Sequence, residues 1–159
     1  MNNVYLLTGA NLGDRKEQLR RAMNGIAEKC GTIIDHSSLY ETAAWGNTNQ
    51  NDFLNQVMLI ETRLGARALL NEILALENRM GRVRTARYEP RIIDIDILFF
   101  NHEIIHQHGL IVPHPELQNR RFVLEPLVEI APALIHPQYY KTLQQLLIEC
   151  PDLLAVKKL

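Results

Sequence analysis

The sequence predicts an α+β fold, in which an antiparallel sheet carries helices on one face and a C-terminal extension follows. Two observations favour this fold class. Short segments rich in β-branched residues alternate with amphipathic segments in the order β-α-β-β-α-β. No repeat, linker or low-complexity stretch divides the 159 residues, a length typical of one domain. We therefore expect a single domain over residues 1–159.

The first three elements have clear boundary signals. Residues 4–9 form an apolar run that predicts a strand ending in a glycine-containing turn. Asp14 suits a helix N-cap, with Glu17 as its capping-box partner. The helical apolar stripe that follows ends near Gly31. Residues 32–42 then read as a strand.

The middle of the chain repeats this alternation. Residues 43–52 have turn chemistry and no period, which indicates a loop, and residues 54–63 form the next strand. The strongest helical pattern covers residues 66–80, with Gly81 as its C-cap. An arginine-rich loop leads into a strand over residues 92–100.

The C-terminal part predicts a hairpin over residues 102–111, a proline-rich turn at 112–115 and a short helix around 122–131. A final helix is expected after the capping-box pair Thr142 and Gln145. The element order is that of the split βαβ, ferredoxin-like arrangement, which would leave the second sheet face free for a ligand. This topology alone does not give a function.

Composition and charge limit the classes of partner. Hydrophobic residues make up 47% of the chain and the net charge is −1, which argues against a general nucleic-acid binder. Positive charge is instead concentrated between Arg79 and Arg91, as a small polyanion would require. Cys30 and Cys150 have no metal-binding spacing and are expected to be reduced thiols. No signal peptide or membrane span is apparent, so we expect a cytoplasmic protein without membrane contact.

Asp94 and Asp96 are the candidate metal ligands. Side chains alternate along a strand, so these carboxylates share one face while Ile93, Ile95 and Ile97 face the core. Carboxylates beside an arginine-rich loop suit a magnesium–polyphosphate ligand. A lone pair of this kind would more simply be an edge strand whose aspartates form salt bridges, but the adjacent arginines favour the phosphate interpretation.

A second candidate set combines aromatic and amide side chains. Asn55 follows Phe53 in a predicted strand, where asparagine is uncommon, and a buried asparagine needs both donors and acceptors as partners. Together with Phe122 these residues could bind a flat heterocycle, although core packing is the simpler explanation for either phenylalanine. His114, between two prolines, is equally consistent with a solvent-exposed loop histidine and with a fixed donor to a phosphate oxygen.

The chain resembles the 6-hydroxymethyl-7,8-dihydropterin pyrophosphokinase family over essentially its full length. The resemblance rests on short motifs in the same order and spacing, each modest alone and specific together. They are Gly9-Ala10-Asn11-Leu12-Gly13, Ser38-Leu39-Tyr40-Glu41-Thr42, Asp52-Phe53-Leu54-Asn55, Glu77 with Gly81-Arg82-Val83-Arg84, Pro90-Arg91-x-x-Asp94-Ile95-Asp96-Ile97, Val112-Pro113-His114, Asn119-Arg120-Arg121-Phe122 and Pro126-Leu127-x-Glu129-Ile130-Ala131-Pro132.

The resemblance implies transfer of the terminal diphosphate of ATP to the pterin hydroxymethyl oxygen, with release of AMP, in folate biosynthesis. It implies that Asp94 and Asp96 hold two Mg²⁺ ions and that Arg82 and Arg91 act with them in catalysis. The implied ATP-binding residues are Glu77, Arg82, Arg84, Arg91, Ile97, His114 and Arg120. The implied pterin-binding residues are Thr42, Ala43, Trp45, Phe53, Asn55 and Phe122.

Two other classes of function share some of these sequence features. A ferredoxin-like RNA-binding module would use exposed aromatic side chains and arginines, but the chain lacks net positive charge and an RNA-binding aromatic strand. A nucleotide sensor that binds ATP without turnover is the second alternative, and only an assay separates it from an enzyme. The expected partners are ATP and the pterin, with no nucleic acid, and the expected oligomeric state is a monomer.

Overall fold

The structure, a computed structural model, describes residues 1–43, 51–82 and 92–159. Its centre is a six-stranded antiparallel sheet with the order β5-β1-β4-β3-β8, in which β2 also pairs with β4. The strands are β1 (Asn2–Ala10), β2 (Thr32–His36), β3 (Tyr40–Thr42), β4 (Phe53–Thr62), β5 (Asp94–Phe100) and β8 (Val156–Lys158). The predicted antiparallel sheet is therefore confirmed.

Two helices pack on one face of the sheet, as expected. α1 (Arg15–Lys29) begins at Asp14, whose carboxylate accepts the backbone N–H of Glu17 at 3.1 Å, so the predicted N-cap is confirmed. α2 (Ala66–Arg79) buries the apolar stripe that its sequence predicted. Buried side chains of both helices form one apolar core with β1, β4 and β5.

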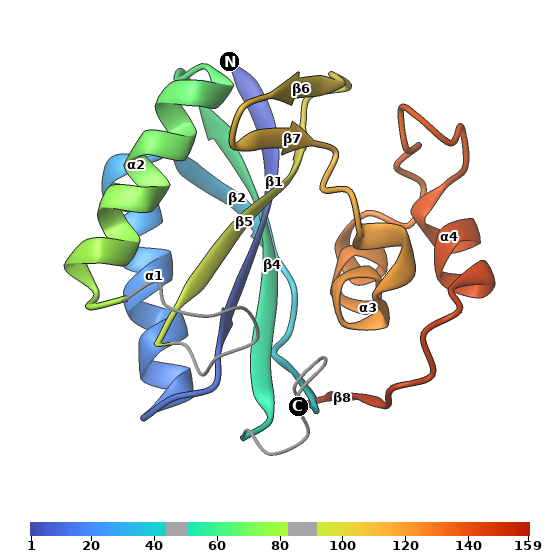
Figure 1. The fold of residues 1–159 in the computed structure, drawn as a ribbon, viewed down its shortest axis with the longest axis horizontal. Coiled ribbons are helices and arrows are strands. Elements are labelled where there is room, and N and C mark those ends of the chain that lie inside the picture. The colour runs from blue at the N-terminus through green and yellow to red at the C-terminus, as the bar shows by residue number, and fades with distance from the viewer. Residues whose placement is uncertain (44–50, 83–91) are drawn as a thin grey trace.

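The second face of the sheet is not left open, and this corrects the expectation of helices on one face only. α3 (Arg121–Ile130) and α4 (Leu143–Glu149) lie on the side of the sheet opposite α1 and α2 (Figure 1). Leu7, Val57 and Phe99 point to this side and join a second core with these helices. The physical reason is that the central strands carry apolar residues on both faces, and both faces require burial.

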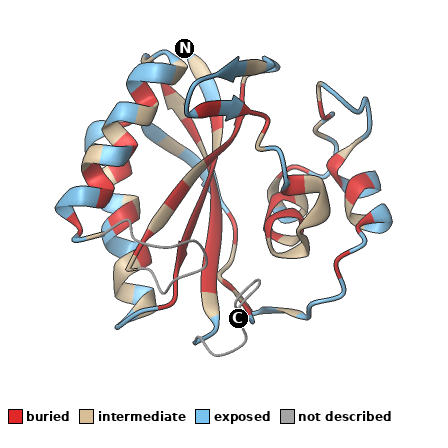
Figure 2. Cartoon of the chain, in the orientation of Figure 1, coloured by how far each residue is buried: buried red, intermediate tan, exposed pale blue. Residues whose placement is uncertain are grey.

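Figure 2 shows this two-sided burial, with the central strands buried along much of their length. Residues 32–42 form β2 and β3 rather than one strand. The register on β4 shifts by one residue between the pairs His36–Met58 and Tyr40–Asn55, and at this break the Ser37 hydroxyl accepts the Val57 N–H at 3.0 Å. The predicted hairpin is confirmed as β6 (Ile105–Gln107) and β7 (Leu110–Val112). The predicted capping box at Thr142 is also confirmed.

The C-terminal segment returns to the sheet, which the sequence did not predict. β8 pairs with β3, so the end of the chain lies beside the strand that precedes residue 43. Within the part of the chain that the structure describes, no helix is long and apolar enough to cross a membrane.

Candidate active site

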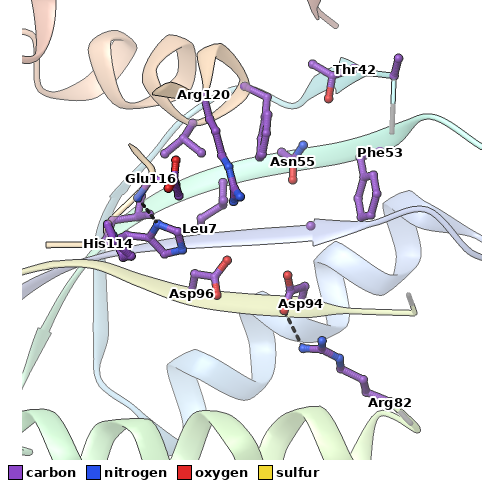
Figure 3. Close-up of a pocket in the computed structure, with 16 residues that line it drawn as sticks. Leu7, Thr42, Phe53, Asn55, Arg82, Asp94, Asp96, His114, Glu116 and Arg120 are labelled. Atoms are coloured by element: carbon purple, nitrogen blue, oxygen red, sulfur yellow. Dashed lines mark hydrogen bonds and ion pairs between the residues drawn. The ribbon is translucent and has the colours of Figure 1, made fainter. Parts of the chain in front are cut away.

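A cavity of about 440 Å³ lies where β1, β4 and β5 face the N-terminal end of α3 (Figure 3). It brings together most of the predicted site residues that the structure describes. They are Thr42, Ala43, Phe53, Asn55, Arg82, Asp94, Asp96, His114, Arg120 and Phe122. Trp45, Arg84 and Arg91 fall outside the described residues.

The two carboxylates project from the same side of β5 into this cavity (Figure 3). Across the ladder Asp94 pairs with Gly9 and Asp96 pairs with Leu7 of β1. The intervening Ile95 is 5% exposed and packs in the core on the opposite face, as the strand period predicted. The alternation of β5 therefore places both carboxylates toward the cavity.

Arg82 is held beside these carboxylates by the end of α2. Gly81 adopts a φ of 90°, the Gly81 N–H donates to the Asn78 carbonyl, and the Arg82 N–H donates to the Glu77 carbonyl at 3.0 Å. This pair of bonds is a Schellman motif, which turns the chain back over the last helical turn. Arg82 Nη1 then lies 2.6 Å from Asp94 Oδ1 and 3.0 Å from Glu77 Oε2.

Glu77 is a buried supporting residue and does not line the cavity. Its side chain is 1% exposed, and Oε2 accepts the Ile95 N–H at 2.8 Å as well as the Arg82 contact. Glu77 faces the sheet, together with the buried apolar side chains of α2. Its carboxylate joins α2, Arg82 and the strand that carries the aspartates.

The other end of the cavity contains an amide beside aromatic rings. Asn55 is 3% exposed and pairs with Gly9 across β1 and β4. A Cβ atom at Gly9 would lie 2.4 Å from Asn55 Oδ1, so glycine makes room for this side chain. Among the described residues Asn55 Nδ2 has no hydrogen-bond partner, although it is buried. A buried amide donor at a cavity wall is one that a ligand acceptor could satisfy.

Phe53 and Phe122 are half-buried and reach this end from different elements, β4 and α3. The Arg120 guanidinium carbon lies 6.0 Å from the centre of the Phe122 ring, within cation–π range. Arg120 therefore stands between the aromatic end and the charged end of the cavity.

His114 is fixed in the turn before α3. Its N–H donates to the Leu98 carbonyl at 3.0 Å, and its ring Nδ1 accepts the Glu116 N–H at 3.2 Å. Burial, aided by the charge of Arg120, lowers the pKa of His114 to about 4. The imidazole is neutral at pH 7, and with Nδ1 as the acceptor its proton is assigned to Nε2.

The structure does not bring the side chain of Ile97 to the cavity, because it packs in the core with α1 and α2. It adds wall residues that the sequence analysis did not assign: Leu7, Gly9, Leu98, Pro115, Glu116 and Val123. A glycine inside a strand is a usable signal of close approach, and it could have identified Gly9. The others depend on strand register and helix placement.

The donor set fits magnesium better than a metal held by protein ligands alone. The described residues contain no group of three or more His, Cys, Asp or Glu side chains arranged to hold a metal ion. Magnesium is usually bound by one or two carboxylates, with phosphate oxygens and water completing its shell. Asp94 and Asp96 supply those carboxylates within the cavity.

Comparison with known proteins identifies a family. The model of the 7,8-dihydro-6-hydroxymethylpterin-pyrophosphokinase family matches residues 5–132. The 2-amino-4-hydroxy-6-hydroxymethyldihydropteridine pyrophosphokinase of Aquifex aeolicus is 42% identical over 145 residues, which cover 91% of this chain and 90% of that protein. The Bacillus subtilis protein of the same name is 44% identical over 132 residues, covering 82% and 79%.

A structural likeness agrees with this assignment. A crystal structure of Plasmodium falciparum HPPK-DHPS superposes with a TM-score of 0.77 at 18% identity. The match covers 93% of this chain and 43% of that longer chain, and at this identity it shows the fold alone. On the strength of the sequence matches, the chain belongs to the 7,8-dihydro-6-hydroxymethylpterin-pyrophosphokinase family.

Proposed function

We propose that this protein transfers the terminal diphosphate of ATP to the hydroxymethyl group of 6-hydroxymethyl-7,8-dihydropterin in folate biosynthesis. The hydroxymethyl oxygen forms a bond to the β-phosphorus, the bond from that phosphorus to the α,β-bridging oxygen breaks, and AMP leaves. The hydroxyl proton is lost, and no residue is assigned as its acceptor. One observation carries the proposal: a single cavity joins carboxylates and cations at one end to an amide and aromatic rings at the other.

The aromatic end suits the pterin. Phe53 and Phe122 can stack on the ring faces, and Asn55 can donate from its buried Nδ2 to an acceptor on the ring edge. Thr42 and Ala43 close the same end of the cavity. Trp45 stays a predicted member of this pocket.

The charged end suits the triphosphate. His114 can donate from Nε2 to a phosphate oxygen, and Arg82 and Arg120 add positive charge on opposite walls. Arg84 and Arg91 stay predicted contacts of ATP, and Arg91 a predicted catalytic group. Glu77 acts through Arg82 rather than by touching the nucleotide. Ile97 can take part only through its backbone, because its side chain lies in the core.

Asp94 and Asp96 would hold magnesium, and we propose two ions. Bound magnesium supplies charge neutralisation and a template for the phosphate oxygens. The protein contributes the alignment of its carboxylates on one strand face and the nearby Arg82, which forms an ion pair with Asp94.

The remaining features are proposals of the same kind. The strand order β5-β1-β4-β2 and the α1 and α2 crossovers support a ferredoxin-like core. Residues 1–159 would act as one catalytic domain, and we expect a cytoplasmic monomer that binds these small molecules and no nucleic acid.

The test is to incubate the purified protein with ATP, Mg²⁺ and 6-hydroxymethyl-7,8-dihydropterin and to separate the nucleotides. The proposal predicts AMP and pterin diphosphate in equal amounts, with no AMP when the pterin is omitted or Mg²⁺ is chelated. ADP as the nucleotide product would instead identify an ordinary kinase. Bound but unconverted ATP would favour the sensor.

A further inference from the structure

The Glu129 carboxylate joins α3 to the strand that leads into the pterin end of the cavity. Ser38, just before β3, donates its N–H to Glu129 Oε1 at 2.9 Å and its hydroxyl to Oε2 at 2.8 Å. The Tyr40 hydroxyl donates to Oε1 at 2.8 Å. Lys158 Nζ of β8 lies 3.6 Å from Oε2. Glu129 itself does not line the cavity.

Tyr40 connects this carboxylate to the wall of the cavity. It is 5% exposed and lies opposite Asn55 across β3 and β4, while Thr42 lies opposite Phe53. Residues that face each other across an antiparallel ladder, and alternate residues of one strand, share a face. Through Tyr40, Glu129 is therefore bonded to the same face of the sheet on which Asn55 and Thr42 line the cavity.

The other side of this connection is the helix that carries Phe122. Glu129 follows Phe122 by seven residues, which is about two helical turns, so both side chains lie on one face of α3. α3 packs against β3 and β4. One end of this helix face reaches the cavity, and the other end is bonded to β3.

We propose that Glu129 is a positioning residue for the pterin, which fixes the spacing between Phe122 on α3 and the β3–β4 wall. The inference rests on the proposed function, because it assigns Thr42, Asn55 and Phe122 to the pterin. It predicts that loss of the Glu129 contacts weakens binding of the pterin and not of ATP. Asp94, Asp96 and Arg82 lie on β5 and at the end of α2, outside the Glu129 contacts.

The contacts of Glu129 differ from those of an ordinary surface ion pair. Its side chain is 25% exposed, and its acceptor oxygens take neutral O–H and N–H donors that are fixed by the fold. Burial raises the pKa of Glu129, but the bonds from Tyr40 and Ser38 outweigh it and hold the pKa below its ordinary value. Burial and then the Glu129 bond raise the pKa of Tyr40.

The experiment compares Glu129→Gln, Tyr40→Phe and their double variant with wild type in the full chain. The control is Glu125→Gln, one turn earlier on α3, because Glu125 pairs only weakly, at 3.4 Å, with Arg121 of the same helix. The measurements are kcat, separate KM values for pterin and ATP, and the melting temperature. Tyr40→Phe removes the hydroxyl that bonds Glu129 and retains the buried ring, so it tests the hydrogen bond without leaving a cavity in the core.

The inference predicts that Glu129→Gln and Tyr40→Phe raise the KM for pterin about tenfold and leave the KM for ATP unchanged. The effects of the two changes should be less than additive in the double variant, because both weaken the same Tyr40–Glu129 hydrogen bond. The control should leave both KM values at the wild-type level.

Two results would overturn the inference: a lower melting temperature with both KM values unchanged, or equal changes in both KM values. Either would mean that Glu129 contributes only to general stability. Failure of the wild-type protein to convert the pterin would instead overturn the proposed function, so the two failures are distinguishable.

Discussion

Arg82 and Asp94 form an ion pair in which Nη1 lies 2.6 Å from Oδ1, and the Arg82 side chain is only 8% exposed. The same nitrogen lies 3.0 Å from Oε2 of the buried Glu77. The cation thus stands between a carboxylate that faces the cavity and one that faces the core. Glu77 fixes the position of Arg82, and Arg82 balances Asp94.

Removal of Glu77 should therefore destabilise the fold. Glu77→Ala would leave Arg82 without its buried partner and the Ile95 N–H without its acceptor, at a cost of about 3 kcal/mol in the free energy of unfolding. Urea denaturation measures this cost. Glu28→Ala, at an exposed position of α1, should change stability by less than about 0.5 kcal/mol. Breaking a buried ion pair costs about 3 kcal/mol or more. A loss of less than about 1 kcal/mol in the free energy of unfolding of Glu77→Ala would therefore contradict the role of Glu77 as the buried partner of Arg82.

Asp96 should be required for transfer and not for folding. Asp96→Asn keeps the shape of the side chain but removes the charge that would bind magnesium, so we expect kcat/KM to fall by about 100-fold or more. Steady-state kinetics with the pterin measures the loss, and circular dichroism checks the fold. Asp35→Asn, at an exposed position of β2, is the control. Near-normal turnover of Asp96→Asn would refute the metal assignment.

Gly9 should determine where Asn55 points. A methyl group at Gly9 would lie 2.4 Å from Asn55 Oδ1. Asn55 is buried, so its side chain has little room to move away from the methyl group. Gly9→Ala should raise the KM for pterin about tenfold, the scale of one hydrogen bond lost to a ligand. Gly65→Ala serves as the control, because among the described residues, its chain neighbours aside, no heavy atom lies within 4 Å of the added methyl group. Unchanged pterin KM in Gly9→Ala would exclude this role.

The pH dependence of stability should report on His136. This ring is 1% exposed, and its Nδ1 accepts the Gln138 N–H at 3.1 Å. Burial lowers its pKa from 6.5 to about 4. The unfolded chain takes up a proton near pH 6.5 and the folded protein only near pH 4, so the stability due to neutral His136 is present above pH 6.5 and lost as the pH falls toward 4.

His136→Gln should remove this component. The stability difference between wild type and variant should shrink between pH 6.5 and 4, by up to about 1.4 kcal/mol per pH unit. Denaturation curves at several pH values measure it. Gln138→Ala changes an exposed, non-titrating side chain of the same turn and should keep the wild-type pH profile. A constant difference for His136→Gln would show that His136 does not contribute to the acid sensitivity.

The fold could be predicted from sequence where the signals are local. The Asp14 cap, the Thr142 capping box and the Gly81 stop depend on neighbouring residues, and all are present. β8 could not be predicted in the same way, because its few residues become a strand only by pairing with β3. The placement of α3 and α4 likewise follows from apolar residues on the second sheet face rather than from their own sequences.

In the site, too, some features follow from local sequence and others only from tertiary contacts. The strand period alone places Asp94 and Asp96 on one face. The burial of Glu77 had a usable signal, because it follows Ile73 by four residues and so lies on the apolar stripe of α2. The approach of Gly9 to Asn55 depends on the register of β1 and β4. The hydrogen bonds of Glu129 to Ser38 and Tyr40 depend on how α3 packs against β3. Neither follows from local sequence.

The most direct test of the central claim follows the β-phosphorus of ATP. The purified protein is given Mg²⁺, 6-hydroxymethyl-7,8-dihydropterin and ATP labelled with ³²P at the β position, and the products are separated. The account predicts that all transferred label appears in the pterin product, with unlabelled AMP as the released nucleotide. Label retained in a released ADP would contradict it, because only the γ-phosphoryl group would then have moved.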